Sequence, residues 1–195
     1  MESVKLETTA VAPTPVSSQP PVPAESQSIS QPPAAATPPR AEIEPILKQG
    51  REAGSQGNWE QAQALYKKAL DTYSSDAELW YEYGYASFQL GRLQDSEEAF
   101  RKAVEIKPDY AKAFNDLGVT LEQLNHSAEA LQAYQKAVDL GGAPDAYFNL
   151  ALLQEKLGNY KASVELYEKY IGFDPSSSFA EFARQRIEKL RRLAY

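Results

Sequence analysis

The stretch of sequence that decides the fold reads AELWYEYGYASFQLGRLQDSEEAFRKAVEIKPDY and runs from Ala77 to Tyr110. It places a large apolar residue four positions before a small one. A second small residue follows after twelve more positions, then an aromatic after four and another small residue after three. In this stretch the five positions are Trp80, Gly84, Ser96, Phe100 and Ala103.

The same spacing occurs three more times along the chain, once about every 34 residues. The equivalent positions are Ile46, Gly50, Ala62, Tyr66 and Ala69; Phe114, Gly118, Ala130, Tyr134 and Ala137; and Tyr147, Ala151, Ser163, Tyr167 and Tyr170. A period of this length predicts a solenoid, in which no unit buries its apolar face alone and each stacks on its neighbours. The small residues would let two helices approach closely, while the rings fill the space between them.

The pattern resembles the tetratricopeptide repeat, a helix-turn-helix whose signature places Trp, Leu-Gly and Tyr before Ala, Phe, Ala and Pro. The second unit matches it best and also has the closing Pro108, while Leu117-Gly118 and Pro175 match in later units. The resemblance covers residues 43 to 177 and implies an all-α, right-handed α-solenoid. Its four units would be 43–76, 77–110, 111–143 and 144–177, followed by a C-terminal capping helix at 178–195.

The helix pairs implied by this pattern can be placed along the chain. We expect helices at 43–56, 59–73, 77–90, 93–106, 111–124, 127–140, 145–157, 160–172 and 177–193. The turns inside the units are predicted at Gly57-Asn58, Gly91-Arg92, Asn125-His126 and Gly158-Asn159, because these residues tolerate a left-handed helix end. In the last helix one side is predicted to be apolar and to pack, and it consists of Phe179, Phe182, Ala183, Ile187, Leu190 and Ala194.

Residues 1–40 have a different composition, with nine of the 13 prolines and no aromatic residue. Such a segment does not bury enough apolar surface to offset its loss of entropy on ordering, so we expect a disordered linker. The run from Pro20 to Pro23 leaves a second use open, as a polyproline helix docked on a partner.

Composition excludes several classes of function. A net charge of −7 argues against nucleic-acid binding, and the absence of cysteine excludes disulfides and thiolate metal sites. The only histidine, His126, falls in a predicted turn, and no catalytic, metal-ligating or phosphate-binding set accompanies it. We therefore expect no enzyme activity, cofactor or metal. No apolar run is long enough to span a membrane, which predicts a cytoplasmic protein, or a periplasmic or tethered one if an upstream signal or anchor has been removed.

What the resemblance implies about function concerns the concave groove, which in this fold is lined by the first helix of each unit. The corresponding residues of this chain are Leu47, Arg51, Tyr81, Glu82, Tyr85, Phe88, Lys112, Asn115, Asp116, Val119, Phe148, Asn149 and Leu152. Rings at these positions are predicted to be accessible and to bind a partner segment with apolar anchors and some positive charge. The alternative use of the same rings is packing between neighbouring first helices.

Two functions fit these expectations. The first is a non-enzymatic adaptor or assembly factor that binds a protein segment in the groove. The second is a homo-oligomeric scaffold, in which copies of the chain stack through the ends of the repeat array.

Overall fold

The computed structural model describes residues 40–142, 144–173 and 175–193, which belong to one compact unit spanning Ala35–Tyr195. In these ranges the only regular elements are helices: α1 Arg40–Ser55, α2 Trp59–Leu70, α3 Ala77–Gln89, α4 Leu93–Ile106, α5 Ala111–Gln123, α6 Ser127–Asp139, α7 Pro144–Lys156, α8 Tyr160–Phe173 and α9 Ser178–Leu193. Each predicted helix is present, with ends displaced by at most three residues. The predicted linker, apart from Arg40, and Ala194 lie outside the described residues.

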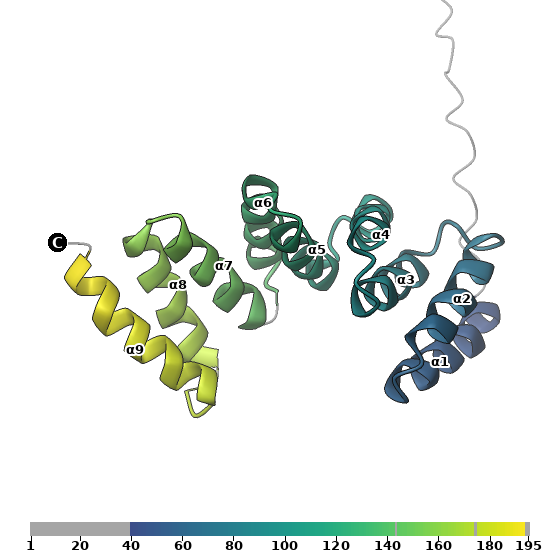
Figure 1. Cartoon of the computed structure of the whole chain (residues 1–195), viewed down its shortest axis with the longest axis horizontal. Coiled ribbons are helices and arrows are strands. Elements are labelled where there is room, and N and C mark those ends of the chain that lie inside the picture. Colours follow the sequence, from purple (N-terminus) through teal and green to yellow (C-terminus); the bar gives the residue numbers. More distant parts are fainter. Residues whose placement is uncertain (1–39, 143, 174, 194–195) are drawn as a thin grey trace, which may run out of the picture. The chain divides into compact units, whose positions relative to one another are not determined.

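The helices pack in chain order, and each contacts the next one along the sequence from α1 to α9 (Figure 1). Helices α1, α3, α5 and α7 are the first helices of the four units and also contact one another in succession, and α9 follows the fourth unit in the place of a further first helix. This is the predicted all-α solenoid. None of the described helices is long and apolar enough to cross a membrane.

The turn inside each unit is closed by the same backbone motif. The second residue after each first helix has a positive φ, which is 78° at Gly57, 71° at Gly91, 64° at Asn125 and 79° at Gly158. In each turn the next N–H donates back to the carbonyl five positions earlier, as from Arg92 to Ser87 at 2.9 Å. The predicted left-handed helix ends are therefore confirmed.

Small residues at the eighth position of a unit allow the ring of the second helix to lie against the first helix. A Cβ atom added at Gly118 would lie 2.5 Å from the Tyr134 ring, and one added at Gly50 would lie 2.3 Å from the Tyr66 ring. Such distances are too short for real contacts, so glycine is required there while the rings keep these positions.

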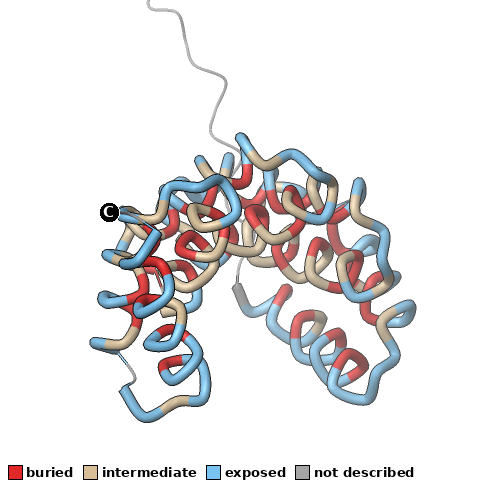
Figure 2. The backbone as a smooth tube through the Cα atoms, turned by 60° about the vertical axis from the view of Figure 1, so that its left-hand side comes forward, coloured by how far each residue is buried: buried red, intermediate tan, exposed pale blue. Residues whose placement is uncertain are grey.

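The core follows the helix interfaces from one end of the unit to the other. In Figure 2 the buried positions lie on the sides of helices that face each other, and exposed positions lie on outer sides and turns. Trp80 packs against the buried residues of both the first and the second pair of helices. Leu166 makes the same connection between the middle of the array and its C-terminal end. Each unit is therefore stabilised by its neighbours, as expected of a solenoid.

The C-terminal helix uses a different face from the predicted one. Ala180, Ala183, Ile187 and Leu190 of α9 are buried against α8, whereas Phe179 and Phe182 are 58% and 41% exposed. The prediction that these two rings share the packing face is wrong. The buried Tyr167 and Tyr170 of α8 occupy this interface, so small residues of α9 face it and its phenylalanines lie to one side.

Candidate functional site

Side chains of successive first helices form a series of contacts that we call the first-helix wall: Arg51, Glu78, Tyr81, Glu82, Asn115, Asp116, Glu122, Phe148, Asn149, Glu155, Lys156, Phe182 and Arg186. These residues come from α1, α3, α5, α7 and α9, and each one reaches the neighbouring first helix.

One contact of the wall recurs between equivalent positions of successive units. Tyr81 donates its hydroxyl hydrogen to Asp116 Oδ2 at 2.7 Å, which joins the fifth residue of one unit to the sixth of the next. One unit later Asn149 Nδ2 donates to Asn115 Oδ1 at 3.0 Å. The two members of each pair are about one repeat length apart in the sequence, so the regular stacking of the units brings them together.

At the N-terminal end of the wall, Arg51 of α1 is held by two carboxylates of α3. Its Nε donates to Glu82 Oε1 at 2.7 Å, and its guanidinium also pairs with Glu78. Burial disfavours the charged guanidinium, but the hydrogen bonds and charges of the two carboxylates outweigh this effect and raise the pKa of Arg51. The predicted groove residues Arg51 and Glu82 therefore bind each other.

Further along the wall a glutamate joins three helices. Glu122 of α5 accepts a 2.9 Å hydrogen bond from the Tyr134 hydroxyl of α6 and a 2.7 Å contact from Lys156 Nζ of α7. Glu122 thus connects α6, the second helix of its own unit, to α7, the first helix of the next unit. Burial and the neighbouring Glu122 charge raise the pKa of Tyr134, so the tyrosine stays protonated and acts as the donor.

The same arrangement recurs one unit later and ties α9 to α7. Glu155 accepts hydrogen bonds from the Tyr167 hydroxyl at 3.2 Å and from Arg186 Nε at 3.0 Å. Burial raises the pKa of Tyr167 to about 12, so it also remains a donor at neutral pH. The sequence signal for this hydrogen bond is a spacing that the groove prediction does not use. Units three and four have a glutamate and a tyrosine twelve residues apart, where unit two has Phe88 and Phe100.

Asp116 is a half-buried carboxylate of the wall. Burial raises its pKa, and the hydrogen bonds from Tyr81 and Asn115 together with the charge of Lys112 offset part of that effect. Lys112 Nζ itself lies 4.9 Å from the centroid of the Tyr81 ring, within the range of a cation–π contact. A carboxylate held in this way is part of the stack.

Two predicted groove residues belong to the core. Leu47 is fully buried together with Ile43 and Tyr66, and Tyr81 is 2% exposed. The Tyr81 ring centroid lies 5.5 Å from that of Phe100 and 5.2 Å from that of Tyr110. The expectation that Leu47 and Tyr81 line an accessible groove is wrong, because both side chains fill space between helices.

Other predicted rings are shared between packing and surface. Tyr85 is half-buried, and its ring meets the Trp59 ring edge to face with the centroids 5.7 Å apart. Phe148 is also half-buried, and its ring centroid lies 5.0 Å from that of Tyr170. Val119 and Leu152 also pack, half-buried, against core clusters. The sequence left open that these rings pack between neighbouring first helices. Tyr85 and Phe148 instead contact rings of the second helices α2 and α8, and all four residues keep part of their surface exposed.

The remaining predicted residues differ in accessibility. Phe88, Asn115 and Asn149 are half-buried, and Lys112 is exposed. Four carboxylates suggested a positively charged partner: Glu82, Asp116, Glu122 and Glu155. Arg51, Lys156 and Arg186 of this chain pair with Glu82, Glu122 and Glu155, and Asp116 accepts hydrogen bonds from Tyr81 and Asn115. The positive charge expected on a partner stays a prediction.

Accessible apolar surface gathers at the C-terminal end of the wall. The rings of Phe148, Phe179 and Phe182 form what we call the C-terminal aromatic cluster. The Phe148 centroid lies 5.4 Å from that of Phe179 and 5.8 Å from that of Phe182. Phe148 supports the two outer rings from behind, while the outer rings face solvent. Exposed aromatic groups held by a rigid support are typical of binding surfaces.

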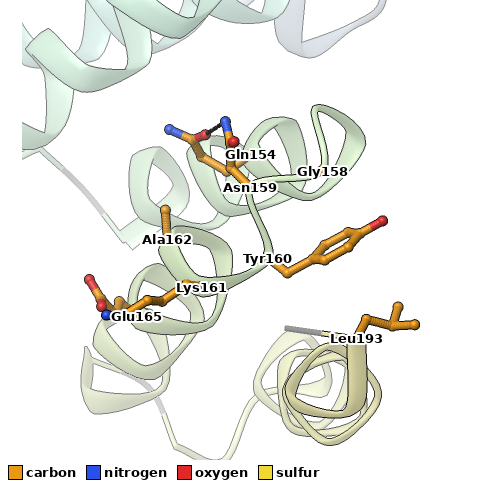
Figure 3. Close-up of a pocket in the computed structure, with 8 residues that line it drawn as sticks. All are labelled: Gln154, Gly158, Asn159, Tyr160, Lys161, Ala162, Glu165 and Leu193. Atoms are coloured by element: carbon orange, nitrogen blue, oxygen red, sulfur yellow. Dashed lines mark hydrogen bonds between the residues drawn. The ribbon is translucent and has the colours of Figure 1, made fainter. Parts of the chain in front are cut away.

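A hollow of about 780 Å³ lies beside the turn between α7 and α8 (Figure 3). Tyr160, Lys161 and Glu165 of α8 line it together with Leu193 of α9. Gln154 and Asn159 are joined by a 2.8 Å hydrogen bond at its edge.

Comparison with known proteins shows which sequences and structures resemble this chain. The sequence profile of the tetratricopeptide repeat matches residues 47–111 and 115–178. No curated protein sequence matches the chain. Crystal structures of MamA are similar in fold: one has a TM-score of 0.62 at 23% identity and covers 75% of this chain and 97% of its own. Another has a TM-score of 0.66 at 22% identity, covering 79% and 88%.

A tetratricopeptide repeat protein from Parabacteroides merdae is also similar, with a TM-score of 0.66 at 17% identity, covering 77% of this chain and 60% of its own. At these identities the likeness concerns the fold alone. The profile match spans more than half of the chain, and the helix pairs, turn glycines and small residues lie where the repeat requires them. The chain belongs to the tetratricopeptide repeat family.

Proposed function

We propose that this protein is a non-enzymatic adaptor that binds a segment of another protein on its first-helix wall. The coarse part of this statement follows from the family, whose members are generally scaffolds for protein interaction. The finer part, a segment bound at the wall, is supported chiefly by the C-terminal aromatic cluster. Its outer rings leave much of their surface in water although the rest of the wall is occupied by internal pairs.

The wall is suited to this role because it is preorganised. The pairs from Arg51 at one end to Arg186 at the other fix the spacing of successive first helices. A partner segment would therefore meet a surface that does not need to be ordered first, which lowers the entropic cost of association.

The alternative, a homo-oligomer assembled through the ends of the array, is less well supported. The side of α9 that a further helix would cover carries charged pairs, Arg184 with Glu181 and Arg192 with Glu188. At the other end the exposed residues of α1 are mostly polar, and Glu42 accepts a hydrogen bond from Tyr73. Polar ends of this kind favour termination of a repeat array over stacking of copies.

Native affinity capture with the full chain, followed by size-exclusion chromatography, tests the proposal. We expect a protein partner that elutes together with the chain in a fixed ratio at physiological salt. A chain that elutes alone over a range of partner concentrations would contradict the adaptor function. Elution only as a multiple of its own mass would support the scaffold instead.

A further inference from the structure

The exposed side of α9 beside the aromatic cluster has a consistent chemical character. At 100° per residue, five of its residues fall on one narrow stripe, which we call the α9 stripe. They are Phe179, Phe182, Arg186, Lys189 and Leu193. Phe179, Phe182 and Leu193 are exposed by 58%, 41% and 55%. Three large apolar side chains in water along one helix face are a costly arrangement unless something covers them.

The charged side chains of α9 are also unevenly distributed around the helix. The helix has five basic and two acidic side chains, a net charge of +3, in a chain whose total is −7. Both cations of the α9 stripe lie among its apolar groups. The two acids, Glu181 and Glu188, lie on the opposite side of the helix and pair there with Arg184 and Arg192. The stripe therefore presents apolar and positive groups together, without a carboxylate of its own helix.

Neighbouring helices add support to the stripe. Phe148 of α7 lies behind Phe179 and Phe182, and Arg186 lies 5.9 Å from the centroid of the Phe182 ring. The α7 carboxylate that reaches the stripe, Glu155, is bound by Arg186 and by Tyr167. Because Glu155 offsets the charge of Arg186, Lys189 is the cation best placed to attract a partner.

We propose that the α9 stripe binds an acidic segment of a partner protein that carries apolar anchor residues. The rings of Phe179 and Phe182 would receive the anchors, and Lys189 would attract the carboxylates. This inference rests on the proposed adaptor function, and it specifies where on the chain the partner binds and which sign of charge the partner carries.

Two other occupants fit these observations less well. Antiparallel pairing of the α9 helices of two copies would bring two net charges of +3 together, which opposes association. An anionic membrane would attract the basic helix, but the remainder of the chain is strongly acidic and would be repelled by the same surface. A short acidic segment avoids both costs.

Selection from a displayed library of random 12-residue peptides, with the full chain as the immobilised target, tests the inference. We expect the enriched peptides to combine Asp or Glu with Leu, Ile, Phe or Trp. Fluorescence anisotropy of the best peptide should show at least a tenfold loss of affinity for Phe179→Ser/Phe182→Ser. It should also show a threefold to tenfold loss for Lys189→Glu, falling with added salt.

Matched controls are available on the same molecule. Ile106→Ser removes a large apolar side chain that is 38% exposed elsewhere, and Lys136→Glu reverses an exposed charge on α6. Neither should change the affinity by more than about twofold. Circular dichroism and thermal melting of each variant check that the fold is retained, and Lys189→Glu provides the test if the double serine variant does not fold.

Several results would overturn the inference. They are enrichment of basic peptides, no enrichment at all, or binding that is unchanged in the Phe179→Ser/Phe182→Ser and Lys189→Glu variants. Phenylalanine-dependent sedimentation with phosphatidylglycerol vesicles would assign the stripe to membranes, and a phenylalanine-dependent dimer in sedimentation velocity would assign it to a second copy. If the stripe variants still capture the cellular partner, the inference fails while the adaptor function stands.

Discussion

Glycine at the eighth position of a unit sets how closely its two helices approach, and Gly118 is the clearest example. A Cβ atom there would lie 2.5 Å from the buried Tyr134 ring, whereas one added at Gly172 in α8 would meet nothing within 4 Å. We predict that Gly118→Ala lowers the free energy of unfolding by roughly 1–3 kcal/mol because the ring must move.

The matched change Gly172→Ala should raise the free energy of unfolding by about 0.5–1 kcal/mol, because it improves helix propensity without a clash. Urea denaturation of both variants measures the difference. A stability of Gly118→Ala equal to that of the wild type would show that the two helices of the unit are not tightly apposed.

The half-buried carboxylate of Asp116 makes stability depend on pH in a defined direction. Burial raises its pKa, so the native state binds its proton more tightly than the unfolded state does. The stabilising contribution of this proton is complete below the ordinary aspartate pKa and is lost as pH rises through the raised value.

We therefore predict that the stability of the wild type, relative to Asp116→Asn, increases as the pH falls from 7 toward 4. Thermal melting of both proteins across this range gives the comparison. The opposite trend would mean that the hydrogen bonds from Tyr81 and Asn115 outweigh burial.

At the scale of the element, α9 closes the array and is part of its stability. Ile187 and Leu190 are buried against α8, and each contributes roughly 1.5–3 kcal/mol by burial. Removal of residues 178–195 should therefore lower the free energy of unfolding by at least about 3 kcal/mol. It would also expose Tyr167 and Tyr170.

Changes on the far side of α9 should behave differently. Arg184→Ala and Arg192→Ala remove exposed ion pairs and should each alter stability by no more than about 1 kcal/mol. Chemical denaturation of the shortened chain and of the two arginine variants tests both statements. A shortened chain with wild-type stability would show that α9 is an appendage and not a cap.

At the scale of the whole molecule, the fold could be predicted from the sequence and much of the site could not. Among the described residues, the repeat spacing predicts the helices α1 to α8 because glycine, alanine and ring positions such as Gly84 and Phe100 are fixed by packing inside a unit. Contacts between units are less constrained, since they depend on which side chains meet across the stack.

This difference explains the particular errors at the site. The position of Tyr81 on a first helix is the same whether its ring faces a ligand or the core, and only the stack decides between them. Phe179 and Phe182 were expected in the interface because they are large and apolar, yet Ala180 and Ala183 occupy it. Large residues of the preceding helix had already filled that space.

The most direct test of the central claim replaces single residues by the photo-reactive p-benzoylphenylalanine in the full chain within cells. The adaptor account predicts that the group at Phe182 cross-links to another protein under ultraviolet light. The same group at Ile106, which is similarly exposed, should give no such product. Equal cross-linking from both positions, or products that contain only copies of this chain, would contradict the account.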